Sequence, residues 1–232
     1  MNLKKIIAET YYRPQRIIAN FFDEPAVILI YHRVVELQRD PQLLAVKPDN
    51  FYRQIEYLKK SYNLLTVEEF NYLIHAKKKF PPNSILLTFD DGYADNLANA
   101  VPILESLSAQ ALFFVTTSNL NTGEEMWWDK LDQIFFSDKD LPNKLSILLN
   151  GREFNFDLSN EQMKQKTYNS LHPLIKFNKK DLRDDILKRL FEWAGLIPLE
   201  RENYRMLQDS EVLRMAESNA AVLGAHTHTH TP

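Results

Sequence analysis

Four short apolar segments constrain the fold of this chain more than any other feature of its sequence. They are AVILIY at residues 26–31, SILLTF at 84–89, ALFFVTT at 111–117 and AAVLGA at 220–225. Bare apolar runs of this length, bounded by polar or turn residues, are typical of strands that are covered on both faces. Because segments with helical spacing separate them, the sequence predicts an α/β fold with a parallel sheet.

Helix-start signals appear twice between the first two apolar segments. A helix is expected from about Pro48, with Asp49 or Asn50 near its N-cap. A second helix is expected from Thr66, because Glu69 three residues later completes a capping box. This order of strand, helix and strand is that of a βαβ unit.

The pattern changes over residues 121–210, which we interpret as an insertion or subdomain. It begins with an aromatic-rich helix, WWDKLDQIFF, at 127–136. A β-hairpin is expected around Asn150 and Gly151, because this pair suits the two positive-φ positions of a tight turn. Two polar helices follow, and Gly195 marks the end of the second.

Composition excludes several classes of protein. The 232 residues fit one large domain or one domain with an insertion. The chain has no cysteine, which excludes a disulfide scaffold, a thiolate zinc site, an iron–sulfur cluster and a cysteine nucleophile. The 28 basic and 31 acidic residues nearly balance, so nucleic acid is not an expected partner. No segment approaches the ~18 consecutive apolar residues that a membrane span requires.

The N-terminal segment, residues 1–25, has a basic start that is similar to that of a signal peptide. Its apolar stretches are broken by Glu9, Arg13 and Arg16, so it lacks a continuous hydrophobic region. We therefore expect a short amphipathic leader helix and a cytoplasmic location. The alternative is weak peripheral contact with a membrane through the apolar side chains of Ile6, Ile7, Ile17, Ile18, Phe21 and Phe22.

Two of the apolar segments run directly into residues that carry chemistry. The second ends in Asp90, Asp91 and Gly92, and the fourth ends in HTHTH, which begins at His226 and ends at His230. Adjacent carboxylates repel one another, and a bound dication offsets that repulsion. Neighbouring residues on a strand point to opposite sides, so one carboxylate can bind a metal while the other stays free as a base.

The two outer histidines extend this hypothesis. If the chain forms a helical turn after the strand, His226 and His230 face the same way. Two histidines and one carboxylate leave an open position for water, which is typical of a catalytic divalent site. Taken alone, DDG is typical of a turn or a helix cap, and HTHTH of a solvated tail or a tag remnant. Their occurrence together, each directly after an apolar strand, favours the metal site.

These segments resemble a known family. TFDDGY at residues 88–93 and GAHTHTH at 224–230 are similar to the first two motifs of the polysaccharide deacetylases, also called carbohydrate esterase family 4 or the NodB-homology domain. The ILIYHRV, ALFFVTT and WWD segments also match the family. The resemblance covers about residues 26–130 and 207–232, and it does not explain the intervening insertion.

The resemblance implies a distorted (β/α) barrel, incomplete here. It implies that Asp91, His226 and His230 bind a divalent metal, usually zinc and sometimes cobalt or another ion, and that Asp90 is the catalytic base. His228 is not a ligand in the family pattern. Thr227 would support the turn that sets the two histidines. The reaction would be hydrolytic removal of an acetyl group from an acetylated saccharide.

Three residues are candidates for substrate binding. His32 follows the first strand and is expected at the barrel mouth, with a structural role as the alternative. Family geometry implies that the backbone amide of Tyr93 orients the oxyanion. The rings of Tyr93, Trp127 and Trp128 could stack on a sugar, although aromatic residues at helical spacing are more often part of a core.

The sequence departs from the family pattern because the later motifs are not found. Those motifs supply an arginine that orients the base, an acetyl pocket and a histidine general acid. We therefore expect a truncated chain with a leader at 1–25, the first part of the barrel at 26–120, an insertion at 121–210 and a final strand with the histidine motif at 211–232.

Three functions remain open at this point. The first is a metal-dependent deacetylase that acts on an N-acetylated or O-acetylated saccharide of a bacterial surface polysaccharide. The second is an inactive relative that retains metal or glycan binding. The third is a metal-dependent hydrolase of another amide or ester.

Overall fold

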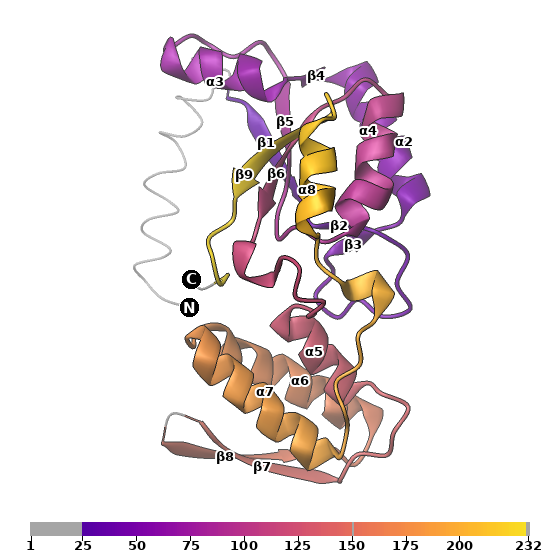
Figure 1. Ribbon diagram of the computed structural model, residues 1–232, viewed down its shortest axis with the longest axis vertical. Coiled ribbons are helices and arrows are strands. Elements are labelled where there is room, and N and C mark those ends of the chain that lie inside the picture. The colour runs from indigo at the N-terminus through magenta and orange to yellow at the C-terminus, as the bar shows by residue number, and fades with distance from the viewer. Residues whose placement is uncertain (1–24, 150, 231–232) are drawn as a thin grey trace, which may run out of the picture.

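A computed structural model describes residues 25–149 and 151–230, which form two lobes (Figure 1). One lobe is built on a parallel sheet, and the other contains three helices and a hairpin. The leader helix predicted for residues 1–25 and the turn residue Asn150 lie outside the described residues, apart from residue 25 itself. The cytoplasmic location stays a prediction. In the part of the chain that is described, no helix has the length and apolar character needed to cross a membrane.

The central sheet confirms the predicted parallel arrangement. Its main path has the order β1-β5-β6-β9, and β4 also pairs with β5, always in parallel. Among the described residues the sheet stays open, so closure into a barrel is not seen. Its strands are β1 (Val27–Tyr31), β4 (Asn63–Leu64), β5 (Ser84–Phe89), β6 (Ala111–Val115) and β9 (Ala221–Ala225).

Helices pack against one face of this sheet (Figure 1). The core between them includes Phe51 and Ile55 of α2, Leu104 of α4, and Phe89 and Phe113 of the sheet. A π-helical turn, η1, leads directly into α4. The helices of this lobe are α2 (Pro48–Ser61), α3 (Val67–His75), η1 (Asn96–Ala100), α4 (Val101–Ser106) and α8 (Asp209–Ala216).

The expectation that every strand is covered on both faces is correct for β5 and wrong for β1. All six residues of β5 are buried. In β1, Leu29 and Tyr31 face the core, whereas Ile28 and Ile30 are 49% and 59% exposed. Alternate side chains of a strand face opposite sides, and the side of β1 that carries Ile28 and Ile30 lies away from this core.

The predicted helix starts were correct in position, but only one predicted cap forms. The Thr66 side chain accepts a hydrogen bond from the Glu69 N–H, and the Glu69 carboxylate accepts one from the Thr66 N–H. Helix α2 instead begins after Lys47, which makes no side-chain cap. Pro48 takes the first helical position because its φ suits a helix and it lacks an N–H, so Asp49 and Asn50 lie inside the first turn.

The second lobe has a hydrophobic core of its own. The predicted hairpin is confirmed, and the side chains of β7 alternate between exposed and buried. Gly195 ends α7 with a φ of +59°. The core of this lobe contains Leu131, Phe135, Tyr168, Leu171 and Leu190. Its elements are α5 (Trp127–Phe135), β7 (Lys144–Leu149), β8 (Arg152–Asp157), α6 (Glu161–Lys176) and α7 (Lys180–Ala194).

The remaining short elements lie outside the central sheet and the hairpin. They are β2 (Arg33–Val34), β3 (Ala45–Val46), η2 (Thr117–Asn119) and η3 (Glu202–Tyr204). The domain boundaries expected from the sequence stay predictions.

Candidate metal centre and active site

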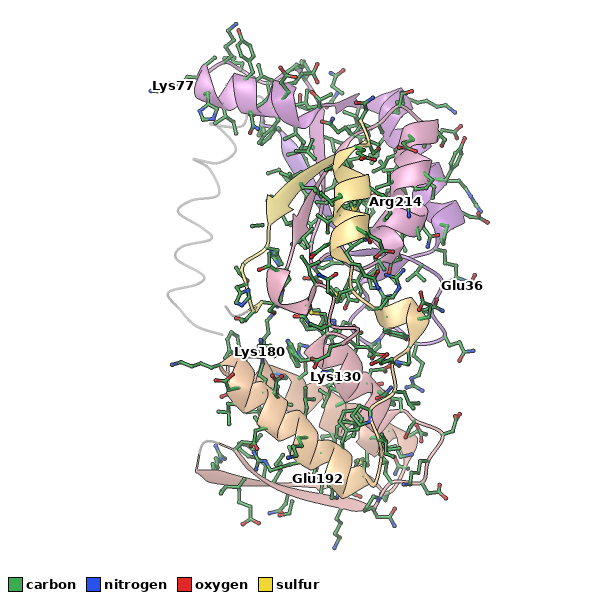
Figure 2. All side chains as sticks on the ribbon, in the orientation of Figure 1. Glu36, Lys77, Lys130, Lys180, Glu192 and Arg214 are labelled. Carbon is green, nitrogen blue, oxygen red and sulfur yellow. The ribbon has the colours of Figure 1, made fainter. Side chains whose placement is uncertain are left out.

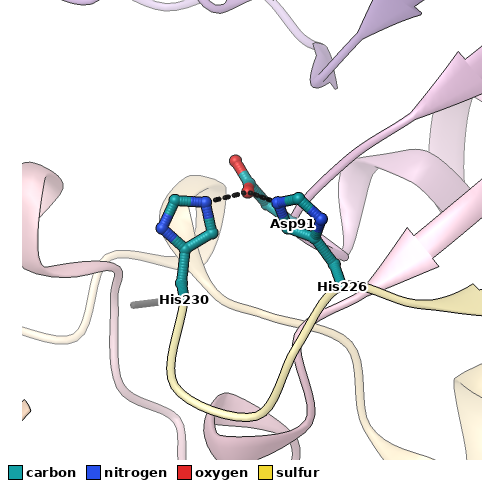
Figure 3. A group of neighbouring side chains, drawn as sticks. All are labelled: Asp91, His226 and His230. Atoms are coloured by element: carbon teal, nitrogen blue, oxygen red, sulfur yellow. Dashed lines mark ion pairs between the residues drawn. The ribbon is translucent and has the colours of Figure 1, made fainter. Parts of the chain in front are cut away.

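The three predicted ligands, Asp91, His226 and His230, lie together at the carboxyl end of the sheet. Figure 3 shows the imidazoles of His226 and His230 on either side of the Asp91 carboxylate. The Asp91 Oδ1 atom lies 3.6 Å from His226 Nε2 and 3.3 Å from His230 Nε2. The ligand atoms of the three residues all lie within 4.8 Å of one another. Parallel strands bring their carboxyl ends to one edge, which explains how residues so far apart in sequence meet.

Asp91 occupies a strained and buried position directly after β5. Its φ of +78° lies in the left-handed region, which is uncommon for a residue with a side chain. The Asp91 carbonyl accepts a hydrogen bond from the Thr116 N–H. Gly92 follows with a φ of +85°, and a Cβ there would lie 2.8 Å from Val115 Cγ1. Gly92 is therefore required both by its φ and by the close approach of β6.

The loop after β9 determines where the two histidine side chains lie. The His226 N–H donates to the Val115 carbonyl, so this histidine is held by the end of β6. Thr227 then adopts a φ of +61°, and its Oγ1 accepts a hydrogen bond from the His230 N–H. The prediction of a helical turn is therefore wrong. A tighter turn, closed by the Thr227 hydroxyl, brings the same two rings together.

His228 points away from this cluster. Its Nδ1 lies 2.9 Å from the Thr117 Oγ1, within hydrogen-bond distance. Its backbone carbonyl accepts a hydrogen bond from the Ser118 N–H. His228 therefore anchors the loop to η2.

The geometry of the cluster fits a divalent metal. Two ligand atoms that each lie about 2.1 Å from one tetrahedral ion are about 3.4 Å apart. The distances of 3.3 and 3.6 Å from Asp91 Oδ1 match this value. In the described part of the chain, this oxygen is buried and accepts no hydrogen bond. A cation bound between the carboxylate and the two imidazoles would satisfy it.

Asp90 lies beside this cluster and is half-buried. Its backbone N–H donates to the Tyr31 carbonyl, which fixes the residue at the end of β5. Burial raises the pKa of the Asp90 carboxyl, and the neighbouring His226 and His32 side chains oppose that rise. Within residues 25–149 and 151–230, no arginine forms an ion pair with Asp90.

The three predicted substrate-binding residues have different surroundings. His32 is partly exposed, and its electrostatic effect on Asp90 places it near that residue. Tyr93 is fully buried, and its hydroxyl donates to Asp129 Oδ2 at 2.6 Å and accepts from Trp128 Nε1 at 2.8 Å. Trp128 is also buried, with its ring edge against His230. Both rings belong to the core of the second lobe, which favours the core alternative for them, and sugar stacking stays a prediction. A role for the Tyr93 backbone amide stays a prediction.

Several buried charges near the site were not found by sequence reasoning. Burial raises the pKa of Asp129 to about 7, against the opposing effects of Arg33 and the Tyr93 hydroxyl. Arg33 is buried, forms an ion pair with Asp95 and lies over the Tyr93 ring. Arg183 of α7 donates to the backbone beside His230. Asp129 follows two tryptophans, which is a weak signal of burial, whereas nothing in the local sequence marks Arg183.

Comparisons with known proteins agree with these motifs. A sequence model of the polysaccharide deacetylase family matches residues 77–144, which include the Asp90 and Asp91 motif. This part of the chain is similar to the polysaccharide deacetylase family. It is 32% identical over 89 residues to a putative polysaccharide deacetylase, YxkH, of Bacillus subtilis, covering 38% of this chain and 30% of that protein. It is 28% identical over 194 residues to the poly-beta-1,6-N-acetyl-D-glucosamine N-deacetylase of Staphylococcus aureus, covering 74% of this chain and 63% of that protein.

The chain therefore spans less than two thirds of the length of these two curated relatives. Solved structures with some similarity include IcaB from Ammonifex degensii, with 26% identity, a TM-score of 0.40 and coverage of 48% of each chain. The BpsB deacetylase domain from Bordetella bronchiseptica has 19% identity, a TM-score of 0.40 and coverage of 86% of this chain and 53% of that one. At these TM-scores we base no structural argument on the likeness.

Proposed function

We propose that this protein is a metal-dependent deacetylase that removes acetyl groups by hydrolysis from an N-acetylated or O-acetylated saccharide of a bacterial surface polysaccharide. The observation that supports this most strongly is the Asp91, His226 and His230 cluster with a second carboxylate, Asp90, beside it. The Staphylococcus aureus relative is named for the N-deacetylation of poly-beta-1,6-N-acetyl-D-glucosamine, so an N-acetylglucosamine polymer is the first substrate to test.

The residues divide into two roles in this proposal. Asp91, His226 and His230 would hold the ion, and zinc suits their two nitrogens and one oxygen. When bound, such an ion polarises a carbonyl oxygen and lowers the pKa of water. The positive φ of Asp91 turns its carboxylate toward the histidines, while Asp90 stays outside the ligand set. Cobalt or another divalent ion is the alternative.

Asp90 is the proposed general base. A carboxylate accepts a proton from water more readily when its pKa is raised, and burial raises that of Asp90. His32 lies near enough to influence the charge of Asp90, so we propose that it faces the substrate at the same end of the sheet. Both residues follow parallel neighbouring strands, β5 and β1, whose ends are aligned by the pairing of Phe89 with Tyr31.

A second function, binding of metal or glycan without turnover, has an observation of its own. In the described part of the chain no arginine forms an ion pair with Asp90, although the family pattern implies a cationic partner for the base. The open sheet with exposed Ile28 and Ile30 also fits an incomplete catalytic domain. This function predicts zinc binding with no release of acetate.

Acetate release from N-acetylglucosamine oligomers distinguishes the two functions. The zinc-loaded protein is compared with Asp90→Asn, which keeps the proposed ligands, and with His226→Ala, which removes one. The deacetylase proposal expects release by the wild type and at least a hundredfold loss in both variants. Equal release by all three proteins would refute it. Zinc binding without release by the wild type would favour the second function.

A further inference from the structure

We propose that Arg183 is a positioning residue that holds His230 in its metal-binding orientation from the second lobe. This inference rests on the metal site of the proposed function, and it adds that the site is assembled between the two lobes. Arg183 belongs to α7 of the second lobe. It donates hydrogen bonds to the backbone of the loop that carries His230.

Arg183 reaches the His230 loop with both terminal nitrogens. Its Nη1 donates to the His230 carbonyl at 3.1 Å, and its Nη2 donates to the Thr229 carbonyl at 2.6 Å. The side chain is only 2% exposed, and its guanidinium lies 5.8 Å from the centre of the Trp127 ring. Figure 2 shows Lys180, one turn earlier, at the end of α7 that faces the sheet lobe. The planar fork of an arginine presents two terminal nitrogens to two adjacent carbonyls, whereas a lysine offers a single nitrogen at the end of a flexible stem.

A second residue of the same lobe fixes the imidazole ring of His230. The edge of the Trp128 ring packs on it, with centroids 5.0 Å apart and an interplanar angle of 67°. Trp128 is itself fixed, because its Nε1 donates to the Tyr93 hydroxyl, which donates to Asp129. The backbone of His230 is thus held by α7, and its ring by α5.

The other histidine is held differently. The His226 N–H donates to the Val115 carbonyl, and the His226 carbonyl accepts from the Thr116 hydroxyl. Val115 is the last residue of the sheet strand β6, and Thr116 follows it. His230 has no such bond to a strand in the described residues, and its φ of +48° is unfavourable for a residue with a side chain. Contacts from outside the loop are therefore needed to keep this conformation populated.

The surroundings of Arg183 also argue against a merely structural role. No carboxylate lies within ion-pair distance of it among the described residues, and its Nε–H is buried without an acceptor. A buried cation without a carboxylate partner is costly, and an apolar side chain at this position would pack without that cost. The hydrogen bonds from Arg183 to the carbonyls of Thr229 and His230 explain why a charged side chain is buried at this position.

Zinc affinity, measured by chelator competition on the full chain, tests this inference. Arg183→Met removes the fork and the charge, and Arg183→Lys keeps the charge alone. Arg189→Met is the matched control on the same helix, because Arg189 pairs with Asp185 and donates to Leu148, far from the histidines in sequence. We expect Arg183→Met to weaken zinc binding ten- to a hundredfold, Arg183→Lys to weaken it less, and Arg189→Met to leave it within twofold.

A double-mutant cycle separates positioning from general destabilisation. In a His230→Ala background, Arg183→Met should change zinc affinity by less than twofold, because its effect passes through His230. An equal loss in both backgrounds, or zinc binding by Arg183→Met as tight as in the wild type, would overturn the inference. Tighter binding would show that the charge of Arg183 only repels the ion, and would overturn it equally.

Amide hydrogen exchange without metal provides a readout that does not depend on the proposed function. The His230 N–H donates to Thr227 Oγ1, so its exchange rate reports how well the turn is held. We expect Arg183→Met to speed this exchange at least tenfold and Arg189→Met to leave it unchanged. Unchanged exchange in Arg183→Met overturns the inference. Absence of zinc binding in the wild type, with exchange accelerated in Arg183→Met, refutes the metal site while the positioning of the loop stands.

Discussion

Substitution of Gly92 by alanine tests how closely the carboxylate motif is packed against β6. Gly92 has a φ of +85°, and a Cβ would lie 2.8 Å from Val115 Cγ1 and 3.3 Å from Val115 Cα. The positive φ costs an alanine about 1–2 kcal/mol, and overpacking against a strand costs about 1–3 kcal/mol more. We therefore expect Gly92→Ala to lower the free energy of unfolding by about 2–5 kcal/mol.

Gly151→Ala is the matched control for this substitution. Gly151 has a similar φ of +75°, but a Cβ there would meet no atom within 4 Å. Gly151→Ala should lower the free energy of unfolding only by the cost of the positive φ, about 1–2 kcal/mol. Urea unfolding followed by circular dichroism measures both variants. If the two lose the same stability, the close contact between Gly92 and Val115 is wrong.

Three further predictions follow from the site and its surroundings. His226→Ala should abolish zinc binding. His228→Ala should leave the zinc affinity within threefold of the wild-type value, because His228 lies outside the ligand cluster. Calorimetric titration with zinc measures both variants. Asp129 has a pKa of about 7 when folded, so it keeps its proton up to a higher pH in the folded state than in the unfolded state. The free energy of unfolding of the wild type, relative to that of Asp129→Asn, should therefore fall as pH rises from about 4 through 7. If the urea midpoints of the two proteins change in parallel across this range, the raised pKa of Asp129 is wrong. Thr66→Ala removes one half of the capping box and should destabilise the protein by about 1 kcal/mol in the same assay, with no change in zinc binding.

The strands and the metal cluster could be predicted from the sequence for a simple physical reason. Two of the apolar strands, β5 and β9, run directly into a chemical motif, and in a parallel sheet such motifs lie at the same end of the strands. The pairing of Phe89 with Phe113, and of Val115 with Ala225, fixes β5 and β9 on either side of β6. Asp91 and the first histidine therefore had to lie near one another once the strand assignments were correct.

The features that escaped prediction depend on contacts between distant residues. The exposure of Ile28 and Ile30 depends on which face of β1 packs against the core, and an apolar run does not reveal that. The tight turn at Thr227 replaces the predicted helical turn because its hydroxyl closes the loop. The contact of Arg183 with His230 joins residues 47 apart in the sequence, with no local pattern to indicate it.

Anomalous diffraction from zinc-loaded crystals tests the shared metal site most directly. We expect one strong peak at the carboxyl end of the sheet, with Asp91 Oδ1 and the Nε2 atoms of His226 and His230 each about 2.0–2.2 Å away. A peak on His228, or the absence of any peak among these three side chains, would contradict it.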